Sequence, residues 1–253
     1  MALWLSQIVQ AYGIKTGVEF WRQTMPRSMG SLFWQFNDCW PITSWSSVDY
    51  FGRWKALQYT ARRFYAPILV SGREISLDGT VDVFVTSDRL EDADGELYWN
   101  ATDVHGNMLA NGSSELKIPA RQSRKVQTLD LSELCRDFGV DNVLVWLKLD
   151  ANGQTVSENL VAFVPPKLIK LVDPQVQTTA IEKMPDGFLV TFVANNPALW
   201  VWLNSDEDAN YSDNFLHLPA NSPRQILVQP KLPMSQTNID KTLRIQSLFD
   251  TYS

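Results

Sequence analysis

Hydrophobic residues near the N-terminus recur at intervals of three and four. The apolar positions are Trp4, Ile8, Ala11, Ile14, Val18 and Trp21. This spacing predicts an amphipathic helix from Ala2 to about Gln23, whose apolar stripe must be buried. Pro26 follows and is expected to stop it. The two tryptophans of the stripe are therefore expected in the core.

A run that is apolar on both faces, Gly30 to Phe36, comes next. Such a run is typical of a parallel strand that is covered on each side. A second helical pattern extends from about Arg53 to Tyr65, with Trp54 on its apolar side and Pro67 beyond its end. The order helix, buried strand, loop, helix indicates an α/β unit.

After Pro67 the pattern changes to an alternation of period two, interrupted by clusters of Asp, Gly and Asn. Alternation of this kind predicts an antiparallel β-sandwich, with a short helical turn at Leu131 to Phe138. Its clearest strand patterns are Val81 to Val85, Glu96 to Trp99 and Val143 to Leu149.

Pro165 and Pro166 have no backbone N–H group to donate the hydrogen bonds that a central strand needs, so we expect a domain boundary there. Alternating runs beyond it predict a second small sandwich. These runs are Thr178 to Ile181, Gly187 to Val193, Leu199 to Leu203 and Arg224 to Val228. The predicted fold is mainly β with an N-terminal α/β remnant, divided into residues 1–66, 67–165 and 166–253.

The composition argues against several classes of function for this chain. The net charge of -6 opposes a nucleic-acid partner, because phosphate binding needs clustered Lys and Arg. The two cysteines lie far apart and the chain has only two histidines, which argues against a zinc site; no metal or cofactor is expected. Residues 1–13 lack the positive region of a signal peptide, and no apolar run is long enough to cross a bilayer.

Two stretches identify a family. Gly30 to Pro41 and Ser44 to Leu57 resemble the end of the catalytic barrel in β-mannosidases of glycoside hydrolase family 2. Tyr211 to Phe215, followed by Arg224 to Val228, is similar to the final immunoglobulin-like domain of these enzymes. The resemblance implies that the chain carries only the last helix, strand and helix of a (β/α)₈ barrel, because a complete barrel takes roughly 250 residues.

The catalytic carboxylates are expected to lie outside this chain. A retaining glycosidase needs two carboxyl groups about 5 Å apart, and the resemblance implies two glutamates on earlier barrel strands. Glu19 is the only glutamate before Arg73, and it is predicted to be a solvated helix residue. Asp38 and Asp49 do not match the catalytic motifs. No catalytic residue is assigned, and the chain alone is predicted not to hydrolyse glycosides.

The resemblance implies instead a substrate-binding set of four residues: Trp34, Asn37, Asp38 and Trp40. Sugars pack their C–H faces on aromatic rings, and their hydroxyl groups need hydrogen-bond partners. Trp34 would lie beneath the sugar, although plain core packing is the alternative. Asp38 could equally shape a turn. The implied partner is a β-mannoside or manno-oligosaccharide in the intact enzyme.

Other readings remain open. Trp200 and Trp202 face one side of a strand and would form a carbohydrate platform if exposed, or pack between the sheets if buried. Residues 206–208 form a solvated acidic loop or a weak calcium site. The chain could also be an independent carbohydrate-binding or scaffold module, or the product of a misplaced gene start. The compartment stays open, since family members are periplasmic, secreted or lysosomal.

A lone barrel strand has two unpaired edges, which invite pairing with another chain. We therefore expect residues 1–65 either to pack onto the first sandwich or to mediate self-association.

Overall fold

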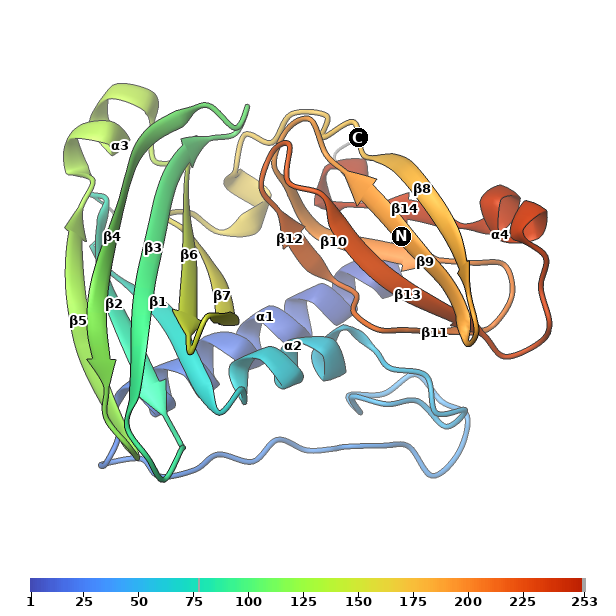
Figure 1. Cartoon of the computed structure of the whole chain (residues 1–253), viewed down its shortest axis with the longest axis horizontal. Coiled ribbons are helices and arrows are strands. Elements are labelled where there is room, and N and C mark those ends of the chain that lie inside the picture. Colours follow the sequence, from blue (N-terminus) through green and yellow to red (C-terminus); the bar gives the residue numbers. More distant parts are fainter. Residues whose placement is uncertain (77, 252–253) are drawn as a thin grey trace. The chain divides into compact units, whose positions relative to one another are not determined.

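The structure is a computed structural model that describes residues 1–76 and 78–251. Two antiparallel sheets lie between residues 68 and 162 (Figure 1). One has the order β1-β2-β5, with β1 Ile68–Ser76, β2 Thr80–Ser87 and β5 Gln122–Asp130. The other has the order β4-β3-β6-β7, with β3 Ala93–Asp103, β4 Met108–Ile118, β6 Val143–Ala151 and β7 Gln154–Ala162. Helix α3, Ser132–Phe138, follows β5, as the sequence predicts.

The core of this first sandwich follows from the alternation of its strands. Val81 and Val83 of β2 are fully buried in one cluster with Val145 and Leu147 of β6. Gly72 of β1 allows the sheets to approach closely, because a Cβ there would overlap the side chain of Val161. The alternating runs are therefore confirmed as strands, and apolar burial between the sheets stabilises them.

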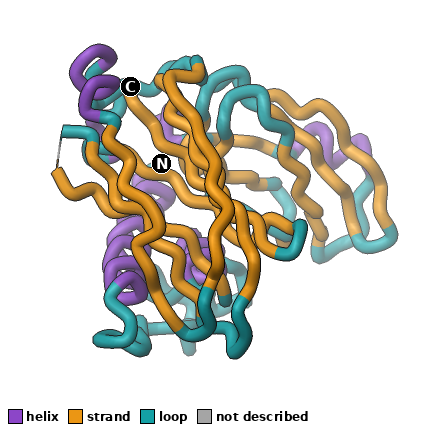
Figure 2. Tube along the Cα trace, turned by 60° about the vertical axis from the view of Figure 1, so that its left-hand side comes forward, coloured by secondary structure: helices purple, strands orange, loops and turns teal. Residues whose placement is uncertain are grey.

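The second sandwich also has two antiparallel sheets. One has the order β12-β10-β14, with β10 Ala198–Asn204, β12 Leu216–Leu218 and β14 Arg244–Gln246. The other has the order β11-β13-β9-β8, with β8 Gln177–Met184, β9 Gly187–Val193, β11 Ala209–Tyr211 and β13 Arg224–Pro230. Helix α4, Gln236–Thr242, and two short 3-10 helices, Pro166–Leu168 and Leu248–Thr251, complete the elements. The predicted fold class is confirmed, and strands predominate along the trace in Figure 2.

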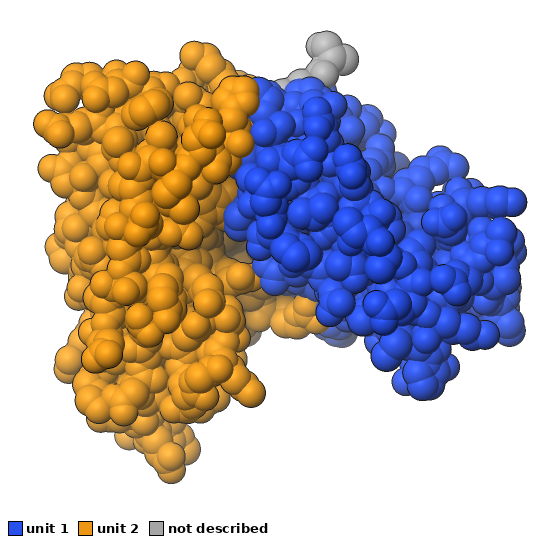
Figure 3. All heavy atoms as spheres, turned by 45° about the horizontal axis from the view of Figure 1, so that its top comes forward, with its two compact units in different colours: residues 1–10, 34–59, 171–253 blue, residues 11–33, 60–170 orange. Residues whose placement is uncertain are grey.

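The chain divides into two compact groups (Figure 3). The first group contains residues 11–33 and 60–170, and the second contains residues 1–10, 34–59 and those from 171 onward. Segments of the predicted α/β remnant are thus found in both groups. The division at residues 66 and 165 stays a prediction.

Helix α1 spans Ala2–Gln23, as predicted. Its buried stripe continues from Val18 to Arg22 rather than to Trp21, which is 45% exposed. Arg22 takes the inward position because it donates hydrogen bonds to three acceptors of the first group. The expectation that Trp21 lies in the core is therefore wrong.

Glu19 is also buried, so its prediction as a solvated residue is wrong. Its carboxylate accepts hydrogen bonds from Asn159 Nδ2 at 3.0 Å and from Lys15 Nζ at 2.9 Å. The Asn159 amide also donates to Val70 O at 3.0 Å. This partner set holds the end of α1 on the first sandwich. The expectation that residues 1–65 either pack onto this sandwich or mediate self-association stays a prediction.

The strand expected at Gly30 to Phe36 is not formed. In this region the structure has only isolated bridges, of Val48 with Asn37 and with Trp54. A strand needs a neighbouring strand with which to exchange backbone hydrogen bonds, and within residues 1–76 and 78–251 no strand pairs with the apolar run. Helix α2, Ala56–Phe64, begins three residues later than Arg53, so Trp54 lies before it and is partly exposed rather than core.

Trp200 is buried and Trp202 is partly buried, so the two do not form an exposed platform. Packing is the reading that the structure supports. Trp146 of β6 is buried and donates from Nε1 to Thr102 Oγ1 at 3.0 Å.

Candidate functional site

The candidate site is the segment from Trp34 to Lys55, called here the aromatic loop. Trp34 is 77% exposed and Trp40 is 62% exposed. Phe36 and Trp45 are also exposed, and the peptide bond between Trp34 and Gln35 is cis. Within the described residues Trp34 is therefore not packed in a core, and its role toward a sugar stays a prediction.

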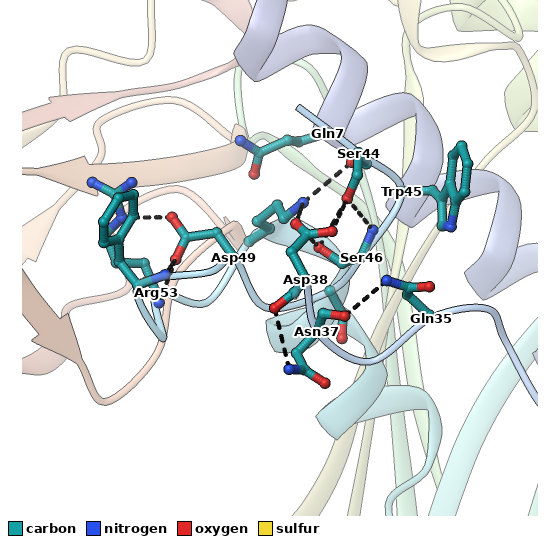
Figure 4. Close-up of polar contacts among 12 residues, drawn as sticks. Gln7, Gln35, Asn37, Asp38, Ser44, Trp45, Ser46, Asp49 and Arg53 are labelled. Atoms are coloured by element: carbon teal, nitrogen blue, oxygen red, sulfur yellow. Dashed lines mark hydrogen bonds and ion pairs between the residues drawn. The ribbon is translucent and has the colours of Figure 1, made fainter. Parts of the chain in front are cut away.

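Asp38 points inward, in contrast to the tryptophans on either side. The residue is only 6% exposed, and its carboxylate accepts hydrogen bonds from Ser44 Oγ at 2.5 Å and Ser46 Oγ at 2.6 Å (Figure 4). Lys55 Nζ lies 3.6 Å from the same carboxylate and donates to Ser44 O at 3.1 Å. The hydrogen bonds from Ser44 and Ser46 lower the pKa of Asp38 below its usual range. Of its two predicted roles, the geometry favours the shaping of the loop.

Asn37 is exposed and adjoins this cluster. Its side-chain amide donates to Asp38 O at 3.4 Å, and its own carbonyl accepts from Gln35 Nε2 at 2.8 Å. Its backbone bridges Val48 in parallel. The side chain of Asn37 is therefore exposed next to Asp38.

Ser47 closes the loop from within. Its N–H donates to Phe36 O at 3.1 Å, its hydroxyl lies 2.9 Å from the same oxygen, and Val48 N donates to Phe36 O at 2.8 Å. Lys55 N donates to Ser47 O at 2.9 Å. These bonds replace the missing strand pairing, so the segment keeps one backbone path without regular structure.

Asp49 organises the turn before helix α2. Its Oδ1 accepts from the N–H groups of Phe51 and Arg53, both at 2.9 Å, and its Oδ2 accepts from Arg53 Nε at 2.6 Å (Figure 4). The guanidinium group lies 5.1 Å from the centre of the Phe51 ring. Asp49 therefore caps this turn, not the helix, and both of its oxygens are occupied.

Sequence reasoning did not identify Lys55, Arg53 or Gln10 as parts of this arrangement. Gln10 of α1 donates from Nε2 to Trp45 O at 2.5 Å. Lys55 and Asp38 are seventeen positions apart, and no local pattern pairs them. Only the closure of the loop brings them together.

The acidic loop at residues 206–208 is paired with basic side chains. Asp208 lies 3.4 Å from Arg53 Nη1 and 3.9 Å from Lys231 Nζ, and Asp206 lies 3.3 Å from Arg244 Nη2. Within residues 1–76 and 78–251, no cluster of three His, Cys, Asp or Glu side chains has the arrangement of a metal site. In the same ranges no helix combines the length and apolar character of a membrane span.

Comparisons with known proteins agree with this architecture. Residues 79–167 match a family model described as a Mannosidase Ig/CBM-like domain, and residues 171–251 match one described as an Ig-fold domain. Beta-mannosidase A of Neosartorya fischeri is 32% identical over 217 residues, which cover 79% of this chain and 23% of that protein. Beta-mannosidase of Bos taurus is 28% identical over 267 residues, covering 99% of this chain and 30% of that protein.

A solved structure shows the same similarity. The beta-D-mannosidase of Dictyoglomus thermophilum superposes with a TM-score of 0.83 and 26% identity, covering 96% of this chain and 29% of that one. This chain spans between 23% and 30% of the length of these three relatives. The resemblance inferred from the sequence is confirmed.

Proposed function

We propose that this chain, which corresponds to the C-terminal region of β-mannosidases of glycoside hydrolase family 2, supplies one wall of a mannoside-binding site but not the catalytic carboxylates. The observation that carries the proposal is the exposure of Trp34 and Trp40 on a loop whose Asp38 carboxylate is bonded internally to Ser44 and Ser46. The reaction of the whole protein would be retaining hydrolysis of terminal β-mannosides.

The chemistry of the loop supports a binding role. An indole ring buries 150 Å² or more when it is covered, at about 25 cal/mol per Å², so the C–H face of a sugar recovers part of this free energy. Asn37 can offer a donor and an acceptor to a hydroxyl group beside Trp34. Asp38 supports this surface from beneath through Ser44 and Ser46 and does not contact the sugar directly.

The acids of the loop are unsuited to catalysis. A general acid needs a raised pKa to hold its proton near neutral pH, whereas hydrogen bonds from Ser44 and Ser46 lower the pKa of Asp38. Asp49 uses both oxygens to hold its turn. The purified chain should therefore be inactive.

An aryl β-mannoside assay tests this conclusion. We expect no release of the aryl group above a buffer blank. Turnover that disappears in Asp38→Asn or Asp49→Asn would overturn it.

Binding is tested separately with manno-oligosaccharide. The indole N–H signal of Trp34, identified by its absence in Trp34→Ala, should shift on titration in a two-dimensional NMR spectrum. Trp21→Ala is the matched control, because Trp21 is a partly exposed indole on helix α1. Saturable binding that persists in Trp34→Ala and Trp40→Ala would favour a carbohydrate-binding role for the sandwiches instead.

A further inference from the structure

We propose that the second sandwich positions the aromatic loop, through Trp202 in its aromatic contacts and Asp208 in its ionic contacts. This inference rests on the proposed function, because the loop that these two residues would position is the sugar-facing loop. The sandwich would hold the loop in place. Trp202 and Asp208 are positioning residues, because neither would contact the sugar directly.

A continuous chain of rings leads from the sandwich to the loop. Trp202 of β10 stacks on Trp4 at 6.3 Å and on Phe215 at 5.9 Å between ring centres. Phe215 lies 6.1 Å from Tyr59 of α2, and Tyr59 meets Trp54 edge to face at 5.2 Å. The chain of contacts ends at Trp54, next to the turn that Asp49 caps.

Ionic and polar contacts with the second sandwich hold the same turn. Asp208, between β10 and β11, lies 3.4 Å from Arg53 Nη1. Lys231, directly after β13, donates from Nζ to Phe51 O at 3.4 Å and lies 3.9 Å from Asp208. A backbone bond from Lys231 N to Asp208 O, 2.8 Å long, fixes the two residues relative to each other.

The loop has internal hydrogen bonds but no regular strand pairing, since its ladder is limited to isolated bridges at Val48, so the contacts with the second sandwich add to what holds it. Buried aromatic pairs contribute more than exposed ion pairs, whose attraction is weakened by water. Trp202 is therefore expected to have a larger effect on the loop than Asp208.

Hydrogen exchange measured by mass spectrometry on the full chain tests the proposal. The reporting peptide covers residues 44–55, in which the N–H groups of Val48, Arg53 and Lys55 are bonded. Peptides from β9 and β13 report on the sandwich itself. Trp202→Ala should raise exchange in the loop peptide about tenfold, and Trp202→Phe should restore it to within about twofold because a ring remains to stack.

Asp208→Asn should raise exchange of the loop peptide about two- to fivefold, the size expected for an exposed ion pair. Asp206→Asn is the matched control, because Asp206 lies in the same acidic loop as Asp208 but pairs with Arg244 instead of Arg53. In this control variant, the exchange of residues 44–55 should equal that of the unmodified chain.

The proposal is overturned if the loop peptide is unchanged in both Trp202→Ala and Asp208→Asn. It is also overturned if β9 and β13 accelerate as much as the loop in Trp202→Ala, since Trp202 would then merely stabilise the sandwich. If Trp202→Ala does not fold, the surface variant Asp208→Asn with its control decides the question. The NMR titration of Trp34 with manno-oligosaccharide tests the proposed function, and hydrogen exchange tests the positioning of the loop. Failure of one proposal can therefore be distinguished from failure of the other.

Discussion

Replacing Arg22 by methionine should destabilise the first group strongly. Arg22 Nη1 donates to Phe64 O at 2.6 Å and to Ala66 O at 2.9 Å, and Nη2 donates to Asp88 Oδ2 at 2.7 Å. The side chain is buried, and burial lowers the pKa of the guanidinium group while Asp88 opposes that shift. One residue therefore ties α1 to the end of α2, to the following linker and to the loop after β2.

The magnitude follows from the three acceptors. The buried Phe64 carbonyl loses its donor at a cost of about 1–3 kcal/mol, and the half-buried Ala66 carbonyl adds less because water can reach it. Asp88 is half exposed, so its ion pair adds at most about 1 kcal/mol. Removal of a buried charge offsets part of this. We expect a net loss of about 2–4 kcal/mol, or a melting temperature lowered by about 3 °C per kcal/mol.

Urea and thermal unfolding followed by tryptophan fluorescence measure the loss. Arg27→Met is the matched control, because Arg27 is exposed at the end of the same region and its replacement should change stability by less than about 0.5 kcal/mol. Asp88→Asn isolates the ion pair. The reasoning is refuted if Arg22→Met loses less than about 1 kcal/mol, or if Asp88→Asn loses as much as Arg22→Met.

Three further outcomes are expected. The pKa of Asp38 lies below its ordinary value of 3.8 because Ser44 and Ser46 donate hydrogen bonds to the carboxylate. The stabilisation that the ionised carboxylate gives is therefore complete above pH 3.8 and is lost as the pH falls through the folded-state pKa. A carboxyl NMR titration with a midpoint at or above 3.8 would contradict this. Gly72→Ala should cost about 1–3 kcal/mol in urea unfolding because its Cβ overlaps Val161, and adding Val161→Ala should recover most of the loss; no recovery would argue against this packing. Cys39 is exposed and should react with a thiol reagent in the native chain, whereas Cys135 is buried with its pKa raised to about 11 by desolvation and should react only after unfolding; two fast thiols in the native chain would disprove this.

The candidate site shows where sequence reasoning ends. The stretch from Gly30 to Pro41 placed Trp34, Asn37, Asp38 and Trp40 together, but it could not tell which of them face outward. That choice depends on the serines and on Lys55, which reach Asp38 only when the loop closes. The assignment of Trp34, Asn37 and Trp40 to a sugar stays a prediction.

The choice of buried residues along α1 was also decided by contacts with distant parts of the chain. The periodic pattern gave the bounds of the helix, yet it favoured Trp21 over Arg22 as the inward residue. Arg22 is buried because carbonyl and carboxylate acceptors more than forty residues away satisfy its guanidinium group. Hydrophobicity alone does not contain that information.

The sequence by itself determined the elements whose energetics are local or periodic: helix α1 and the alternating strands of both sandwiches. Tertiary structure alone decided that Gly30 to Phe36 does not form a strand, because a strand exists only when another strand exchanges hydrogen bonds with it. It also decided which polar side chains are buried, since the burial of a charge depends on partners that distant parts of the chain supply.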